Sequence, residues 1–150
     1  MMIGELNETQ TKNLLSSQVM GRLACSYKRQ PYIVPITFTY DGIDIYGQTH
    51  EDEKLKIFRK NPNVCFEVDL ITDISSWQSV LVFGEFEEIA SSLENKVRAI
   101  LCSRVFSLRT TNVIHKYGHE LTTKIEESNW VKPVFFRIKI NKLMGYFQKH

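Results

Sequence analysis

The chain has 150 residues, the length of one domain, which would then span residues 1–150. Hydrophobic residues make up 43% of it and charged residues 24%, a balance that excludes intrinsic disorder as the main state. With 19 Lys and Arg against 17 Asp and Glu, the net charge is +2, which is too even for an obligate nucleic-acid-binding protein.

No apolar run approaches the ~20 residues that a membrane-spanning helix needs. The N-terminal residues lack the basic and apolar regions of a secretory signal. The cysteines Cys25, Cys65 and Cys102 are widely spaced and form no Cys-x-x-Cys pair, so they indicate reduced thiols rather than a disulfide framework or a zinc site. We therefore expect a cytoplasmic protein with no membrane or nucleic-acid partner.

The first part of the chain predicts one helix followed by three strands. Asn7 can cap the helix, with Gln10 completing a capping box, and Leu14, Leu15 and Val19 fall on one face. Alternation and β-branched or aromatic content predict strands at 22–27, 31–40 and 43–47. A polar turn at 28–30 and the hairpin pair Asp41-Gly42 separate these strands. Pro35 lacks an amide donor, so one side of its strand should be unpaired there.

The second part predicts two more helices and the remaining strands. Acids open and bases close a helix at 51–60, which Asn61-Pro62 ends. Strands follow at 64–69 and 77–89, with a loop at 70–76 between them and a bend or bulge at Gly84. Ser92 is expected to cap a helix to about residue 106, with an inward face of Leu93, Val97, Ile100, Leu101 and Val105. Residues 107–129 give no clear pattern, and the last strands are predicted at 134–140 and 143–147.

These elements predict a mainly β fold with appended helices. Six or seven short strands favour a closed or nearly closed antiparallel β-barrel, because closure removes exposed strand edges. The helix at 51–60 interrupts consecutive strands, so we expect it to cross one end of the barrel.

The junction between the third strand and the second helix is one candidate site. A helix N-terminus presents free amides that suit a phosphate, Thr49 could cap this helix and donate its hydroxyl, and Lys54 adds a positive charge. The alternative is structural: the acidic run 51–53 would satisfy the helix dipole and repel a phosphate.

Trp77 and Ser79 form a second candidate, because alternation places them on one face of a strand, where they could border a flat heteroaromatic ligand. The alternative for Trp77 is a core or dimer-interface role. His115 and His119 have the spacing of a metal-binding pair, but Gly118 weakens that helix and no further ligand completes a set. The sequence thus predicts no metal site, and it names no catalytic residue.

The order of the segments resembles the pyridoxamine phosphate oxidase-like flavoproteins, and within them the branch of the nitroimidazole-resistance proteins. The resemblance covers roughly residues 6–90, with a weaker match at 133–145. It rests on these motifs: Gly21-Arg22-Leu23-Ala24, the segment 31–38, Ile45-Tyr46, Lys54, the segment 61–69, Trp77-x-Ser79-Val80 and Gly84.

The resemblance implies a split antiparallel β-barrel that forms a homodimer, with flavin mononucleotide (FMN) at the subunit interface and the dinucleotide (FAD) as the other possibility. It places Val34, Pro35, Ile36 and Thr37 along the isoalloxazine ring, largely through backbone groups. It places Gln48, Thr49 and Lys54 near the ribityl chain and phosphate, and Ser79, with Trp77 beside it, at a strand position that reaches the ring.

Two features depart from the family pattern. Positions 52 and 53 are acidic where many relatives carry a glycine and a base, and His50 does not occupy the position of the functional histidine of the nitroimidazole-resistance branch. Trp130 and Arg137 do not match the pair that holds pyridoxal phosphate, so vitamin B6 oxidation is not expected.

The resulting hypothesis is a flavin-dependent reductase or oxidase acting on a small planar molecule. Because the cofactor carries the electron chemistry, such a protein needs little acid–base help from its side chains. The alternatives are a non-catalytic flavin or heme carrier or sensor, and an interaction module with an empty site. The sequence names neither the substrate nor the electron donor.

Overall fold

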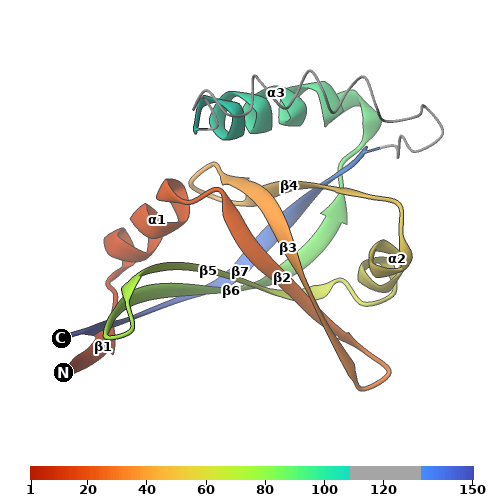
Figure 1. The fold of residues 1–150 in the computed structure, drawn as a ribbon. Helices are drawn as coiled ribbons and strands as arrows, with labels where there is room; N and C mark the ends of the chain where they lie inside the picture. The colour runs from red at the N-terminus through yellow and green to blue at the C-terminus, as the bar shows by residue number, and fades with distance from the viewer. Residues whose placement is uncertain (109–132) are drawn as a thin grey trace, which may run out of the picture.

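A computed structural model describes residues 1–108 and 133–150. This part of the chain forms seven antiparallel strands and three helices (Figure 1). The strands are β1 (Met2–Glu5), β2 (Met20–Tyr27), β3 (Gln30–Tyr40), β4 (Ile45–His50), β5 (Asn63–Asp73), β6 (Ser76–Glu88) and β7 (Pro133–Lys149). The helices are α1 (Glu8–Ser17), α2 (Glu53–Lys60) and α3 (Ser91–Leu108). None of the described helices is long and apolar enough to cross a membrane.

The sheet closes on itself as a ring. Its strand order is β1-β7-β4-β3-β2-β5-β6, and β6 also pairs with β7, so six strands form a closed barrel while β1 adds to the end of β7. The prediction of a mainly β, barrel-like fold with appended helices is thus confirmed. The interior is apolar, and its largest fully buried side chains include Phe38, Phe66 and Phe136.

The closing strand β7 corrects the prediction of two strands at 134–140 and 143–147. It is continuous, and the register of its pairing with β6 shifts between Phe83 and Gly84, where Asn141 is the extra residue on β7. This β-bulge accommodates the polar pair Asn141-Lys142 without ending the strand. The bulge expected at Gly84 is confirmed, and only glycine fits, because a Cβ there would collide with the Lys139 carbonyl oxygen.

Pro35 lies on a free strand edge, as its missing amide predicts. The Phe38 N–H donates to the Val19 carbonyl on the β2 side (2.9 Å). Because amides alternate along a strand, position 35 directs its backbone to the opposite edge. On that edge β3 pairs with β4 only through the residues 38–40, so residues 30–37 have no strand neighbour there in the described chain.

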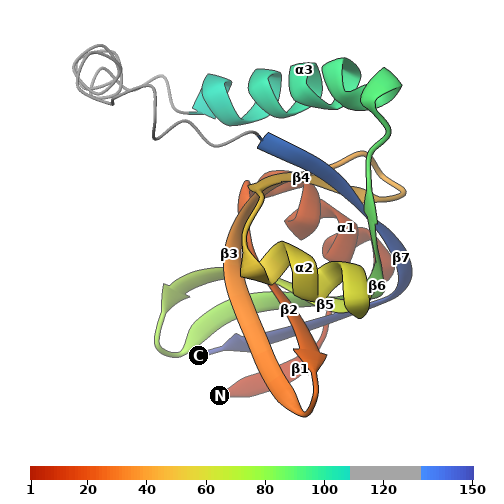
Figure 2. The same ribbon diagram turned by 90° about the vertical axis from the view of Figure 1, so that its right-hand side faces the viewer.

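Helices α1 and α2 cover opposite ends of the ring (Figures 1 and 2). Asn7 caps α1 in the expected capping box with Gln10, but the helix ends at Ser17, so Val19 is not on its inner face. Helix α2 buries Leu55 and Phe58. The Phe58 ring stacks on Phe86 with a centroid distance of 5.1 Å, which seals that end of the barrel as expected.

Helix α3 packs against the outside of the barrel and differs from its prediction. It begins at Ser91, so Ser92 is not its cap. Val97 and Leu101 are buried against Phe135 and Ile100 is partly buried, but Leu93 is 51% exposed. The side chains of Cys102 and Val105, and residues 109–132 with His115, His119 and Trp130, lie outside the described part of the chain.

Two strand segments were missed by the sequence analysis. β1 was not predicted, because its four residues are held by pairing with the distant end of β7. The predicted loop 70–76 is largely strand: β5 continues to Asp73, with a register irregularity between Ile71 and Asp73, before a tight turn into β6. In both places the strand forms because of pairing with residues far away in the sequence, which the local sequence pattern does not show.

Candidate functional site

The barrel opens where β3 and β4 separate. Their last pair is Phe38 with Gly47, and beyond it β3 continues alone on that edge while β4 continues against β7. Thr37 and Gln48 adjoin this last pair, one on each strand, so the structure places them beside each other. Helix α2 begins a few residues after β4 ends. The opening thus brings together three sequence segments: the edge of β3, the end of β4 and the start of α2.

The predicted ring-contacting residues occupy the free edge of β3 with alternating orientation. Ile36 is buried and Val34 is partly buried, and both pack with the barrel core. Pro35 is exposed, and Thr37 is half-buried with its hydroxyl 3.2 Å from the Met20 sulfur. The side chains of Val34 and Ile36 face the core and their backbone groups face β2, so a ligand at this edge would meet the backbone of Pro35 and Thr37.

On the other side of the opening, Gln48 and Lys54 are exposed and Thr49 is half-buried. The expectation that Thr49 caps α2 is wrong. Asp52 is the cap: its Oδ1 accepts from the Leu55 N–H at 2.9 Å. Pairing with β7 keeps residues 48–50 in the strand, so the helix begins at Glu53, two residues later than predicted.

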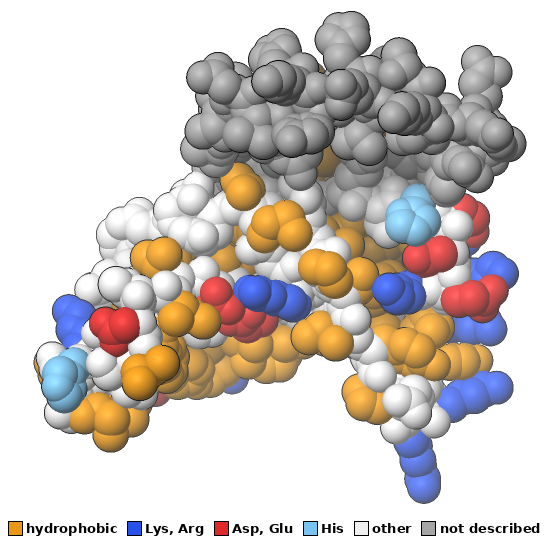
Figure 3. Space-filling view, viewed as in Figure 1, with side chains coloured by type: hydrophobic (Ala, Val, Ile, Leu, Met, Phe, Trp, Pro, Cys, Tyr) orange, Lys and Arg blue, Asp and Glu red, His pale blue; other side chains and the backbone are white. Residues whose placement is uncertain are grey.

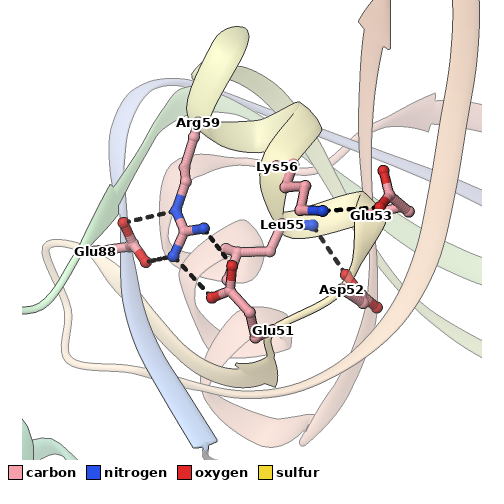
Figure 4. A network of polar contacts seen from close by, with 7 residues as sticks. All are labelled: Glu51, Asp52, Glu53, Leu55, Lys56, Arg59 and Glu88. Atoms are coloured by element: carbon pink, nitrogen blue, oxygen red, sulfur yellow. Dashed lines mark hydrogen bonds and ion pairs between the residues drawn. The ribbon is translucent and has the colours of Figure 1, made fainter.

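The acidic run that precedes Lys54 is compensated residue by residue (Figure 4). Glu51 forms an ion pair with Arg59 at 2.5 Å, and Glu53 forms one with Lys56 at 2.9 Å. Asp52 caps the helix and lies 3.4 Å from His50 Nε2. The hydrogen bond from Arg59 lowers the pKa of Glu51, so this carboxylate stays charged and paired.

Lys54 differs from these neighbours, because it forms no ion pair with any described residue. It therefore stands as an uncompensated positive charge in the first turn of α2, where the helix dipole also favours an anion. The three acids at 51–53 should therefore repel a phosphate less strongly than their charges alone imply.

Trp77 and Ser79 lie elsewhere in the chain. Both are on the outer face of β6: Ser79 donates to Glu67 Oε1 (2.8 Å), and the Trp77 indole donates to Gln148 Oε1 (3.2 Å). Thr49 pairs with Val134 and Ser79 with Tyr146, positions that lie about 40 Å apart along β7. Within one chain, Trp77 and Ser79 are thus separated from Thr49 by twelve residues of β7, and from the free edge of β3 by β2 and β5.

The outer face that carries Trp77 and Ser79 also carries an apolar patch. A concavity of about 630 Å³ lies on it beside the part of the β2–β3 hairpin that is nearest to the turn, and hydrophobic side chains gather on this side of the molecule (Figure 3). Its lining includes Ala24, Tyr32, Ile33, Cys65 and Phe83. An exposed concave apolar patch is typical of an interaction site.

Within the described chain, the thiols do not contribute reactivity. Cys25 and Cys65 are unbridged, and burial raises the pKa of both, so both are protonated at neutral pH. Among the described residues, no three His, Cys, Asp or Glu side chains are grouped so that they could hold a metal ion. Arg137 is already paired with Glu87, its Nε lying 3.0 Å from Oε2.

Sequence reasoning missed the ion-pair network of Arg59. The basic residue was expected only to close α2, but its guanidinium joins Glu51 to Glu88 at the end of β6. The signal available in the sequence was an unusual density of acids ahead of Lys54, which requires a nearby cation.

The pyridoxamine 5'-phosphate oxidase family model matches residues 7–145, nearly the whole chain. The chain belongs to this family. An uncharacterized protein of Rhizobium meliloti (strain 1021) is 28% identical over 92 residues, which is 61% of each chain. The chain thus spans less than two thirds of that relative.

Solved structures of this family type share the fold. A FAD-binding protein from Mesorhizobium loti superposes with a TM-score of 0.73 and 25% identity, over 99% of this chain and all of that one. A 5-nitroimidazole antibiotic resistance protein from Bacteroides thetaiotaomicron gives a TM-score of 0.69 at 15% identity, over 97% of this chain and 87% of that one. These superpositions confirm the predicted fold of this chain, a split barrel of the family.

Proposed function

We propose that this protein binds a flavin at the β3–β4 opening and acts as a flavin-dependent oxidoreductase on a small planar molecule. The observation that carries the proposal is the opening itself: an unpaired strand edge on one side, and an unpaired lysine at a helix start on the other. The FAD-binding relative with 25% identity supports a flavin, either FMN or FAD.

The residues of the opening suit the two ends of such a ligand. The backbone groups of Pro35 and Thr37 face the free edge and offer hydrogen bonds to a flat ring, and no described strand competes for them; those of Val34 and Ile36 face β2. Gln48, Thr49 and Lys54 supply an amide, a hydroxyl and an ammonium group for a ribityl chain and a phosphate.

The flavin would supply the transfer of a hydride or an electron pair. The chain would hold the ring by the β3 backbone, anchor the phosphate end, and leave one ring face open for a flat substrate.

A homodimer would complete the site. Trp77 and Ser79 are separated from the β3 edge of their own chain by β2 and β5, and we propose that they border the ligand bound by a second copy. The apolar outer face beside them provides a surface for such a copy. A ring held by one small barrel would otherwise stay largely exposed to water, whereas ligand sites bury most of their ligand. The unbridged thiols of Cys25 and Cys65 support a reducing, cytoplasmic setting.

Flavin binding is tested by titrating the purified protein with FMN, FAD and riboflavin, followed by absorbance and fluorescence. We expect FMN or FAD to bind more tightly than riboflavin, and Lys54→Ala to weaken FMN binding about fivefold through loss of one exposed charge. Lys96→Ala, an exposed lysine of α3, serves as the matched control and should leave binding unchanged. Failure to bind any of the three flavins would overturn the proposal.

Enzymatic activity is tested on the flavin-loaded protein with NADH or NADPH and a small nitroaromatic acceptor. An oxidoreductase bleaches the flavin with one donor and recovers its colour when the acceptor is added. A protein that binds flavin but is not reduced by either donor would instead be a carrier or sensor.

A further inference from the structure

Arg59 holds two carboxylates from different elements (Figure 4). Its Nη1 and Nη2 lie 2.5 and 2.9 Å from the two oxygens of Glu51, and its Nε and Nη2 lie 3.1 and 2.7 Å from those of Glu88. Both carboxylates are therefore bound in the two-pronged geometry that suits a guanidinium. The network ties the last turn of α2 to the β4–α2 connection and to the end of β6.

Among the three acids that precede Lys54, Glu51 alone relies on a distant residue. Asp52 is satisfied as the helix cap, and Glu53 pairs with Lys56 three positions later. Glu51 instead pairs across α2 with a residue eight positions later. Without Arg59, Glu51 and Glu88 would both be uncompensated carboxylates at the end of the barrel that α2 covers.

Without Arg59, the negative charges of Glu51 and Glu88 would both repel an anion near Lys54, which follows Glu51 by three positions. These groups are partly exposed, so their field is screened but still acts over about 8–10 Å at ordinary ionic strength. An anion in the first turn of α2 would meet one ammonium and two unpaired carboxylates. With Arg59 in place, it meets the ammonium and a network whose net charge is −1.

We infer that Arg59 is a positioning residue for the phosphate end of the flavin site: it offsets the charge of Glu51 and Glu88 and fixes the β4–α2 connection, so that Lys54 can receive a phosphate. This inference rests on the proposed function. Arg59 does not itself touch the ligand in this account, because its donors are engaged by the two carboxylates.

The test compares FMN with riboflavin, which carries the same ring and ribityl chain but no phosphate. Arg59→Gln should weaken FMN binding about fivefold at low salt and change riboflavin binding less than twofold. The triple variant Arg59→Gln, Glu51→Gln, Glu88→Gln leaves no charge in the network, so it should bind FMN at least as tightly as the wild type. Lys12→Gln, which breaks the exposed Lys12–Glu8 ion pair on α1, is the matched control and should alter neither affinity.

A second variant avoids the risk that Arg59→Gln fails to fold. Glu51→Gln removes one negative charge and leaves Arg59 paired with Glu88, so it should bind FMN two- to fivefold more tightly with riboflavin unchanged. If Arg59→Gln weakens FMN and riboflavin binding equally, Arg59 has only a structural role and the inference is wrong. If Glu51→Gln binds FMN with unchanged affinity, the charge of Glu51 does not act on the phosphate, and the inference is wrong as well. If the wild type binds neither ligand, the proposed function itself fails, and this inference fails with it.

Discussion

At the scale of single residues, the turn between β2 and β3 carries backbone strain. Lys28 and Arg29 have φ angles of 50° and 64°, in the left-handed region that L-residues with a Cβ rarely adopt. Two-residue hairpin turns of this kind favour Asn-Gly, because Asn tolerates and Gly freely adopts positive φ. Lys28 also lies 5.4 Å from the centroid of the Tyr27 ring, a weak cation–π contact that offsets little of this cost.

Replacing the turn by Asn-Gly should therefore stabilise the fold. We expect the double variant Lys28→Asn, Arg29→Gly to raise the free energy of unfolding by about 1 kcal/mol, measured by urea denaturation at one fixed protein concentration. Lys28→Arg keeps both the charge and the strain, and it should leave the stability within about 0.5 kcal/mol of the wild type. A destabilised double variant would show that the two cations make contacts that outweigh the strain.

At the scale of elements, the sequence predicts those whose cause is local. The Asn7–Gln10 capping box lies within four residues. Pro35 predicts a free strand edge because it lacks the backbone N–H that a neighbouring strand would need. The continuity of β7, the extension of β5 and the existence of β1 depend on pairing with strands far away in the sequence. The start of α2 was misplaced for the same reason, because pairing with β7 holds Thr49 in a strand.

The capping box of α1 makes a direct prediction. Asn7 Oδ1 accepts from the Gln10 N–H at 2.8 Å, and Gln10 Oε1 accepts from the Asn7 N–H at 2.9 Å. Asn7→Ala removes the cap and should lower the free energy of unfolding by about 1 kcal/mol. Asn13→Ala replaces an exposed residue within α1 and should leave stability unchanged or slightly higher, since Ala favours the helix. Equal effects of the two changes in urea denaturation would contradict a capping role.

The ion pair of Glu51 predicts a response to acid. Its pKa is lowered from the usual 4.5 by the hydrogen bond from Arg59. A carboxylate whose pKa is lower in the folded state stabilises the fold above its ordinary pKa, and this contribution is lost as the pH falls through the lowered value. The melting temperature of Glu51→Gln should therefore lie below that of the wild type at pH 7, and the gap should narrow below pH 4.5. A gap that is constant from pH 7 to pH 3 would show that the charge of Glu51 does not contribute.

At the scale of the whole molecule, the ring places the predicted site residues in two separate groups. The sequence indicates which segments matter, and the structure brings one group together at the β3–β4 opening. Trp77 and Ser79 lie three strands away from β3, across β2 and β5, or about 14 Å at the usual strand spacing. The hydrophobic pattern of the sequence could not predict this separation, because it depends on the order of the strands in the closed sheet.

The outer sheet face is where we propose that a second copy binds. Polar groups at its centre are paired across strands: Arg22 contacts Asp69 at 2.8 Å and Glu67 at 3.5 Å, and Glu67 also accepts from Ser79. Apolar side chains such as Ile33 surround them with no covering element in the described chain. A paired polar centre within an apolar surround is compatible with burial against another copy, since no charge in it is left without a partner.

Dimerisation and flavin binding should therefore fail together. Ile33 is 68% exposed on this face, so Ile33→Asp should leave the barrel folded while placing a charge in the proposed interface. We expect a monomer by sedimentation at micromolar concentration and a loss of FMN affinity of at least tenfold. Ile43→Asp is the matched control, because Ile43 is 74% exposed in the β3–β4 turn, outside this face. A monomeric Ile33→Asp variant that binds FMN like the wild type would show that one barrel suffices, and Trp77 and Ser79 would then have no part in the site.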